Sequence, residues 1–175
     1  YPSKVFFTTD HPNGAPFTSY PELFRLLMDY EFRMEQLSLI NEESTKISFL
    51  KDIKRTYSLY DIAIMTRSSP ANILGLKDRG SLKPGCIADI SIYDPKQNID
   101  HMFRKAKYVF KNGEEIVKNG KILKYKKTST IAANINYEKS IVKNVENWTR
   151  RFYSLDKEEF KVDKNFFRKD NFIYS

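Results

Sequence analysis

Apolar residues recur along the chain with a spacing that changes from helical to strand-like near residue 80. At the start, residues 4–9 form a short aromatic and β-branched run, which predicts a buried strand ending at Asp10. Between residues 19 and 74 the apolar positions recur at helical intervals, and this spacing predicts several helices. Alternation with a period of two at residues 88–94 then predicts a second strand.

Two segments carry start signals for helices. Residues 19–22 (SYPE) combine a capping box with a proline in the first turn. The helix that they begin has one apolar stripe, made up of Leu23, Leu26, Leu27, Tyr30 and Met34. A weaker helix is expected between residues 41 and 49. Residues 58–61 form another capping signal, followed by an apolar run at residues 62–67 that we expect to be buried.

Two Asn-Gly pairs, Asn112-Gly113 and Asn119-Gly120, give the strongest local signal in the second half. A two-residue type I′ turn favours this pair because both of its positions need a positive φ. Two such turns in close succession predict a three-stranded meander between residues 106 and 125.

The last part of the chain predicts one amphipathic helix between residues 137 and 152. Its apolar positions at helical spacing are Ile141, Val145, Trp148 and Phe152. Residues 154–175 mix aromatic and charged residues without a clear period. We expect the aromatic residues of this tail to pack on another surface.

Composition sets the broad class of the protein. The 175 residues are 41% hydrophobic and 30% charged, which provides a core and excludes a wholly disordered chain. No run approaches the roughly 18 apolar residues of a membrane span. The lone cysteine, Cys86, excludes an intrachain disulfide framework and a four-cysteine zinc site, and it favours a reducing, cytoplasmic compartment. Because nothing precedes the first strand to pair with it, we expect the protein to start upstream of Tyr1.

The net charge of +8 is uneven along the chain. Residues 1–100 hold 12 Lys or Arg and 13 Asp or Glu, whereas residues 101–175 hold 18 and 9. A basic half can indicate a nucleic-acid or acidic partner. Here acidic residues are interspersed among the lysines, as on a solvated surface, so we expect no nucleic-acid binding.

Asp10 is the strongest candidate for chemistry. A carboxylate at the end of a buried strand occupies the position where α/β barrels place catalytic groups, and it could bind a metal or act as a base. The alternative is an Asx-turn residue that holds the following loop, and the residues alone leave both open. His11 is a candidate for substrate contact or for a structural role. With His101 the only other histidine, this chain has too few for a full zinc site.

Several segments together resemble one family. Residues 80–90 (GSLKPGCIADI) resemble the Gly-x-Leu-x-x-Gly-x-x-Ala-Asp stretch of the amidohydrolase superfamily, and the two hairpins resemble the closing strands of its β-sandwich. Within that superfamily, residues 7–17 (FTTDHPNGAPF), 57–67 and 70–80 are similar to the family formed by the A subunits of formylmethanofuran dehydrogenase. The resemblance extends from about residue 4 to about residue 125, and more loosely through the tail.

The resemblance implies a fold and a division of the chain. The fold is an α+β fragment in which the last strand and helices of a TIM-like barrel are followed by part of a small β-sandwich and a C-terminal helix. Residues 1–79 would belong to the barrel, residues 80–130 to the sandwich, and residues 131–175 to the helix and tail. The fragment alone would be inactive.

The resemblance also implies the chemistry. In this family a pair of metal ions, usually zinc, is held by histidines and a carboxylated lysine from earlier strands. Asp10 would contact a metal and transfer the proton, with His11 and Asn13 contacting the substrate. These enzymes condense formate with methanofuran, or hydrolyse the formyl product, beside partner subunits that include one with a tungsten or molybdenum pterin.

Two alternatives stay open. The chain could belong to another amidohydrolase, such as a deacylase or a cyclic amidase, that shares the sandwich motifs. It could also be a non-catalytic, basic interaction module, given the positive charge of residues 101–175. The segment from Asp10 to Gly14 favours the formyl-transferring family, because Asp-His-Pro-Asn-Gly is not a general amidohydrolase string.

Overall fold

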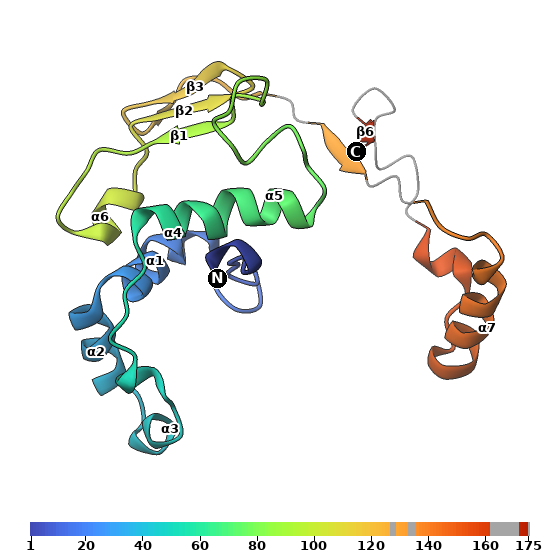
Figure 1. Cartoon of the computed structure of the whole chain (residues 1–175), viewed down its shortest axis with the longest axis horizontal. Coiled ribbons are helices and arrows are strands. Elements are labelled where there is room, and N and C mark those ends of the chain that lie inside the picture. Colours follow the sequence, from blue (N-terminus) through green and yellow to red (C-terminus); the bar gives the residue numbers. More distant parts are fainter. Residues whose placement is uncertain (127–128, 133–135, 162–171, 175) are drawn as a thin grey trace. The chain divides into compact units, whose positions relative to one another are not determined.

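The computed structural model divides the chain into two compact units (Figure 1). The first unit is Tyr1–Lys126 and the second is Lys127–Ser175. The residues that the structure describes are 1–126, 129–132, 136–161 and 172–174.

Helices make up most of the first unit before residue 80. In chain order they are η1 (Pro2–Lys4), η2 (Phe17–Ser19), α1 (Tyr20–Met28), α2 (Tyr30–Ser38), α3 (Glu42–Lys46), η3 (Leu50–Asp52), α4 (Leu59–Ala63), the π-helical η4 (Ile64–Ser68) and α5 (Ser69–Ile73). A further short helix, α6 (Ile99–Phe103), lies between two strands in the sequence. Elements α4, η4 and α5 follow one another without a break and form a single rod (Figure 1).

The rod begins with the predicted capping box. The Ser58 hydroxyl accepts a hydrogen bond from the Asp61 amide at 3.2 Å, and the Asp61 carboxylate accepts one from the Ser58 amide at 2.9 Å. This reciprocal pairing satisfies two amides at the start of the helix that have no partner within it. The apolar run behind the box is only partly buried: Ile62 and Met65 are each 3% exposed, whereas Arg67 reaches solvent.

The sheet of the first unit is antiparallel, with the order β1-β2-β3-β4. Its strands are β1 (Ile90–Ile92), β2 (Tyr108–Lys111), β3 (Glu114–Lys118) and β4 (Lys121–Ile122). Asn112 and Asn119 have φ values of 51° and 48°, and the glycine after each also has a positive φ. The predicted three-stranded meander with two type I′ turns is therefore confirmed.

The predicted strand at residues 4–9 is wrong. Lys4 ends the helix η1, and residues 5–10 belong to no regular element. Val5 and Phe6 are about half exposed, at 50% and 53%. A strand needs a neighbour to receive its amide and carbonyl groups, and none of the strands in the described ranges pairs with this segment. Residues 4–9 therefore have the apolar, β-branched composition of a strand, but no described strand pairs with them.

The first long helix differs from its prediction in two ways. It breaks at Asp29, whose carboxylate accepts a hydrogen bond from the Phe32 amide at 3.0 Å and so begins α2 as a separate helix. The same carboxylate also accepts a hydrogen bond from Arg25 at 3.2 Å. At the start of α1, Ser19 makes no side-chain capping bond, so the capping box expected there is wrong.

An aromatic cluster connects the N-terminal segment to the rest of the first unit. The Phe7 ring lies 5.9 Å from that of Phe24 in α1, and Phe24 lies 4.9 Å from Phe103 in α6. Phe103 in turn lies 5.2 Å from Tyr93, just after β1. Aromatic pairs at these separations pack favourably, and this chain of contacts joins segments that are far apart in the sequence.

The second unit contains β5 (Thr130–Ala132), α7 (Ile141–Tyr153), η5 (Lys157–Phe160) and β6 (Phe172–Tyr174). The predicted amphipathic helix is confirmed as α7. The parallel pair of β5 and β6 was not expected from the sequence. The predicted packing of the tail aromatics falls largely outside the described residues.

The observed architecture is thus a mixture of helices and a small antiparallel sheet, as the α+β prediction requires. The assignment of residues 1–79 to a barrel and of residues 80–130 to a sandwich stays a prediction. Within the described ranges, no helix has both the length and the apolar character needed to cross a membrane.

Candidate functional site

The predicted site residues lie in a compact loop between Thr8 and Phe17. The Gly14 amide donates to the Asp10 carbonyl at 2.8 Å, and the Ala15 amide donates to the Thr9 carbonyl at 2.9 Å. The Asp10 amide donates to the Thr8 hydroxyl at 3.2 Å. These short-range bonds close the loop through its backbone.

The Asp10 carboxylate is left free by this arrangement. An Asx turn would require it to accept from the amide two residues later, but that residue is Pro12, which has no N–H. Among the described residues the carboxylate has no hydrogen-bond or ion-pair partner, and Asp10 is exposed. The alternative that the Asp10 side chain holds the loop in an Asx turn is therefore wrong, because backbone groups hold the loop and the carboxylate does not.

Two neighbours set the position of Asp10, and sequence reasoning missed both. Thr9 is only 5% exposed, so the chain passes from buried to exposed within one peptide unit. Gly14 approaches so closely that a Cβ on it would lie 2.6 Å from the Thr9 carbonyl oxygen and 3.1 Å from the Asp10 Cβ. The glycine in the Asp-His-Pro-Asn-Gly string was the available signal, since close backbone approach is a common reason for glycine.

His11 and Asn13 are also exposed on this loop. The His11 ring stacks on that of Phe17, with centroids 4.2 Å apart and planes inclined by 26°. This contact orients the imidazole without using either of its nitrogens. The structure therefore brings the three predicted residues together on one solvent-facing loop, with hydrogen-bonding atoms of Asp10 and His11 still available.

The loop alone does not make a metal centre. In the part of the chain that the structure describes, no group of three or more His, Cys, Asp or Glu side chains could hold a metal ion. Asp10 could supply only one carboxylate ligand, and a metal site in a protein typically needs at least three protein ligands. The residues of this loop therefore fit a metal site only if other parts of the protein supply the remaining ligands.

A hollow of about 630 Å³ lies between the α4–η4–α5 rod and β1. Its lining is largely apolar and includes Leu74 and Leu82. The charged side chains in the lining are Arg67, Arg79 and Asp89. None of the three predicted site residues contributes to it, so the hollow is separate from the Asp10 loop.

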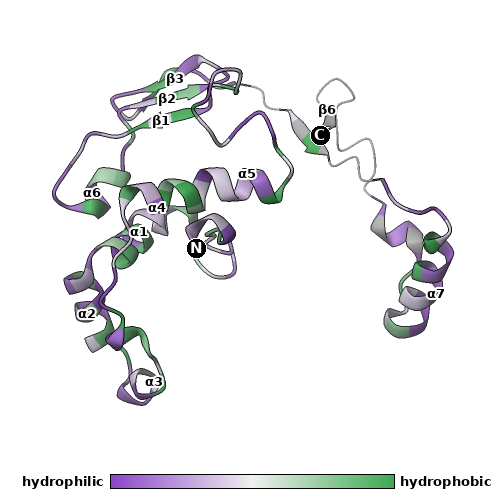
Figure 2. Ribbon diagram, viewed as in Figure 1, coloured by the Kyte–Doolittle hydropathy of each residue, from purple (hydrophilic) through white to green (hydrophobic). Residues whose placement is uncertain are grey.

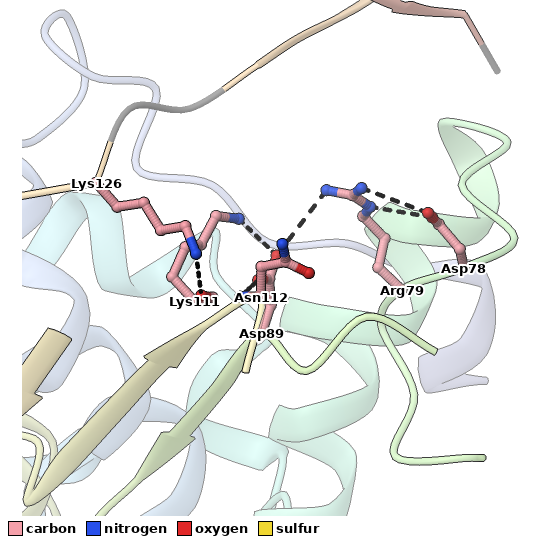
Figure 3. A network of polar contacts seen from close by, with 6 residues as sticks. All are labelled: Asp78, Arg79, Asp89, Lys111, Asn112 and Lys126. Atoms are coloured by element: carbon pink, nitrogen blue, oxygen red, sulfur yellow. Dashed lines mark hydrogen bonds and ion pairs between the residues drawn. The ribbon is translucent and has the colours of Figure 1, made fainter. Parts of the chain in front are cut away.

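Asp89, which lines this hollow, belongs to a network of hydrogen bonds and ion pairs. Figure 3 shows this network. Its carboxylate accepts hydrogen bonds from Lys111 Nζ at 2.5 Å and from the Asn112 amide at 2.8 Å, and Arg79 lies 3.9 Å away. Burial alone would raise the pKa of Asp89, but the bonds from Lys111 and Asn112 outweigh it and lower the pKa. Asp89 therefore joins the β2–β3 turn to the segment before β1.

Comparison with known proteins identifies the family. Residues 2–123 match the model described as the amidohydrolase family. The chain belongs to the amidohydrolase family. The match includes both the Asp10 loop and the β-meander, so the two halves of the first unit belong to one family pattern.

Two proteins are similar to nearly the whole of this amidohydrolase chain. It is 36% identical over 161 residues to the A subunit of the formyltransferase/hydrolase complex Fhc of Methylorubrum extorquens, in an alignment that covers 92% of this chain and 29% of that protein. It is 37% identical over 175 residues to protein FwdA of Methanocaldococcus jannaschii, in an alignment that covers 93% of this chain and 31% of that protein. Both are homologues of the formylmethanofuran dehydrogenase A subunit, so the predicted resemblance is confirmed.

A solved structure agrees with this result. The crystal structure of the formyltransferase/hydrolase complex (FhcABCD) from Methylorubrum extorquens with methylofuran matches with a TM-score of 0.79 at 35% sequence identity. The match covers 99% of this chain and 32% of that chain. The chain therefore spans about a third of the length of the relatives that it matches.

Proposed function

We propose that this chain is the C-terminal part of an amidohydrolase subunit that transfers or hydrolyses a formyl group within a multi-subunit complex. The observation that supports this proposal is the similarity of almost the whole chain to the Fhc A subunit and to FwdA. A substrate of the methanofuran type is supported by the relative that was crystallised with methylofuran. Formate, or the formyl group derived from it, is the second substrate.

Asp10 carries the proton in the proposed reaction. When an amine attacks formate, the nitrogen loses one proton and a C–O bond breaks, and the leaving oxygen becomes water by taking that proton and a second one from solvent. In the hydrolytic direction, water loses a proton and the amine leaves with one. A free carboxylate beside the reacting carbon can accept the first proton and donate it to the leaving group. The Asp10 carboxylate, which is exposed and has no hydrogen-bond or ion-pair partner among the described residues, suits this role.

His11 and Asn13 are proposed as substrate contacts. Both are exposed on the same loop as Asp10. The stacking of His11 on Phe17 fixes the plane of the imidazole and leaves its nitrogens free to bind a polar group of the substrate. The Asn13 amide offers both a donor and an acceptor.

The remaining parts of the proposed site come from outside this chain. A pair of zinc ions would polarise the carbonyl group of the substrate, with Asp10 as the one ligand from these residues. The other ligands would belong to the part of the polypeptide that this chain does not include. Companion subunits would supply formate, one of them through a tungsten or molybdenum pterin.

The substitution Asp10→Asn tests the proposal. Asp10 has a φ of 51°, a conformation that asparagine adopts more readily than most residues, so the loop should keep its shape while the charge is lost. In the longest natural polypeptide that contains this chain, with its companion subunits, we expect kcat for formyl transfer and hydrolysis to fall at least about 100-fold.

Asp52→Asn is the matched control. Asp52 is exposed in η3 and has no ion-pair partner among the described residues, so its neutralisation should leave kcat unchanged. Thermal unfolding should be alike for both variants and the parent. Activity of Asp10→Asn within a few-fold of the parent would refute the proton-transfer role, and absence of any formyl transfer or hydrolysis in the parent complex would refute the proposed function.

A further inference from the structure

The helix α7 carries an apolar stripe that is about half exposed in the part of the chain that the structure describes. Ile141, Val145, Trp148 and Phe152 are spaced so that they lie on one side of an α-helix. They are 51%, 49%, 52% and 60% exposed. Figure 2 shows apolar and polar colours side by side along α7. We call these four residues the α7 stripe.

Most of the other α7 residues are exposed as well, and only Val142, Glu146 and Thr149 are partly covered. Val142 and Thr149 lie beside the α7 stripe on one edge, and the Thr149 hydroxyl donates to the Glu146 carbonyl at 3.1 Å. The α7 stripe is therefore the apolar side of a helix that is exposed at most of its positions. The aromatic members of the exposed side contact each other, with Trp148 and Phe152 ring centroids 5.8 Å apart.

The position of α7 relative to the family boundary points to its role. The amidohydrolase model ends at residue 123, which leaves 52 residues of the chain beyond it. The 161-residue alignment with the Fhc A subunit leaves only 14 residues of the chain outside it, so it includes at least 38 of those 52. The part of the chain that contains α7 is therefore shared with a component of a complex but lies outside the general amidohydrolase pattern.

We propose that the α7 stripe docks into an apolar groove on a companion subunit of the complex. This inference rests on the proposed function, since it needs a multi-subunit assembly. Four apolar anchors in successive helical turns are the pattern of a helix bound in a groove, and Trp is among the residues that contribute most to such interfaces. Docking would bury the exposed rings of Trp148 and Phe152.

Charge next to the α7 stripe defines the partner further. Arg151 lies with its guanidinium carbon 5.2 Å from the centre of the Phe152 ring, and it has no carboxylate partner in the described ranges. Arg150, by contrast, is paired with Asp156 at 2.6 Å. Arg151, which has no carboxylate partner among the described residues, fits a groove whose rim carries a carboxylate.

The experiment compares Trp148→Ala with Lys143→Ala in the longest natural polypeptide that contains this chain. Lys143 lies on the polar side of the same helix, and alanine supports helix formation in both variants. Each protein is mixed with the separately purified companion subunits, and the dissociation constant is measured by titration. We expect Trp148→Ala to bind at least about 30-fold more weakly and Lys143→Ala to bind like the parent.

Further measurements separate the other occupants of the α7 stripe. Phe152→Ala should weaken assembly in the same direction, which guards against local misfolding of Trp148→Ala, and circular dichroism should show equal helicity in all variants. Equal affinity of parent and stripe variants would overturn the docking proposal while leaving the proposed function intact. A parent that fails to assemble with any companion subunit would overturn both. If the isolated parent is a dimer and Trp148→Ala makes it a monomer, the α7 stripe binds a second copy of the chain, and the docking proposal is overturned. If the parent binds anionic phosphatidylglycerol vesicles and the stripe variants still assemble normally, the α7 stripe binds a lipid surface, and the docking proposal is likewise overturned.

Discussion

Substitution of Gly14 by alanine should separate the geometry of the Asp10 loop from its charge. The added Cβ would lie 2.6 Å from the Thr9 carbonyl oxygen, whereas real Cβ contacts essentially never fall below 3.0 Å. The loop would therefore have to open by about 0.4 Å at the least. The atom that it meets is backbone, which cannot swing aside as a flexible side chain would.

The size of the effect follows from what the shift would break. Opening the loop stretches the 2.9 Å bond from the Ala15 amide to the Thr9 carbonyl, and a hydrogen bond of this kind contributes about 0.5–1.5 kcal/mol. Overpacking costs about 1–3 kcal/mol where the site cannot relax, and less on an exposed loop. The loss of stability should thus be about 1–2 kcal/mol. Because Asp10 is next to the displaced carbonyl, kcat/KM should fall about 10- to 100-fold.

Gly85→Ala provides the matched comparison. Gly85 has a φ of 91° and nothing within 4 Å of an added Cβ, so alanine there introduces backbone strain of about 1–2 kcal/mol without a clash near Asp10. Formyl hydrolysis and thermal unfolding of the complete enzyme would be measured for both variants. Full activity in Gly14→Ala would refute the geometric argument, and equal activity losses in the two variants would attribute the effect to stability alone.

Two further predictions concern the first unit. Ser58→Ala removes the hydroxyl acceptor of the capping box at the start of α4, and it should lower the free energy of unfolding by about 1 kcal/mol in a denaturant titration. Ser58→Asp should restore most of this loss, and an unchanged free energy of unfolding in Ser58→Ala would refute the capping role. Hydrogen bonds from Lys124 and Lys126 lower the pKa of Glu114 from 4.5 to about 2. A lowered pKa in the folded state stabilises the fold above the unfolded-state pKa, so this contribution should be lost as the pH falls from about 5 to 2. Glu114→Gln should flatten that part of the stability profile, and an unchanged profile would contradict the assignment.

The features that the sequence predicted correctly are those decided within a few residues. Each Asn-Gly pair determines its own turn, because the two residues tolerate the positive φ that a type I′ turn needs. The capping box at Ser58 and Asp61 is equally local. The helix α7 was predictable because its apolar positions repeat over three turns.

The features that failed depend on residues far away or on competing local bonds. The run at residues 4–9 has the composition of a strand, but strand pairing is decided by neighbours that the pattern does not reveal. The break at Asp29 arises because the Asp29 side chain offers the Phe32 amide an alternative acceptor. The sequence did not predict it, because the apolar stripe continues across the break. At the site, Asp10 was identified by its resemblance to a family, whereas the close approach of Gly14 to Thr9 was visible only in three dimensions.

The Asp10 loop takes its shape from its own chain, and this has a consequence for how the proposed site is assembled. The loop is closed by backbone bonds from Gly14 and Ala15, and the segment before it is anchored to the rod by the bond from the buried Ser69 hydroxyl to the Pro2 carbonyl at 3.0 Å. None of these contacts uses the carboxylate of Asp10. In the proposed site, Asp10 would be held in a fixed geometry before the metal binds, while the other ligands would lie elsewhere in the polypeptide. Such preorganisation lowers the free-energy cost of assembling the site. The same separation explains why Asp10→Asn should remove the chemistry and leave the loop intact.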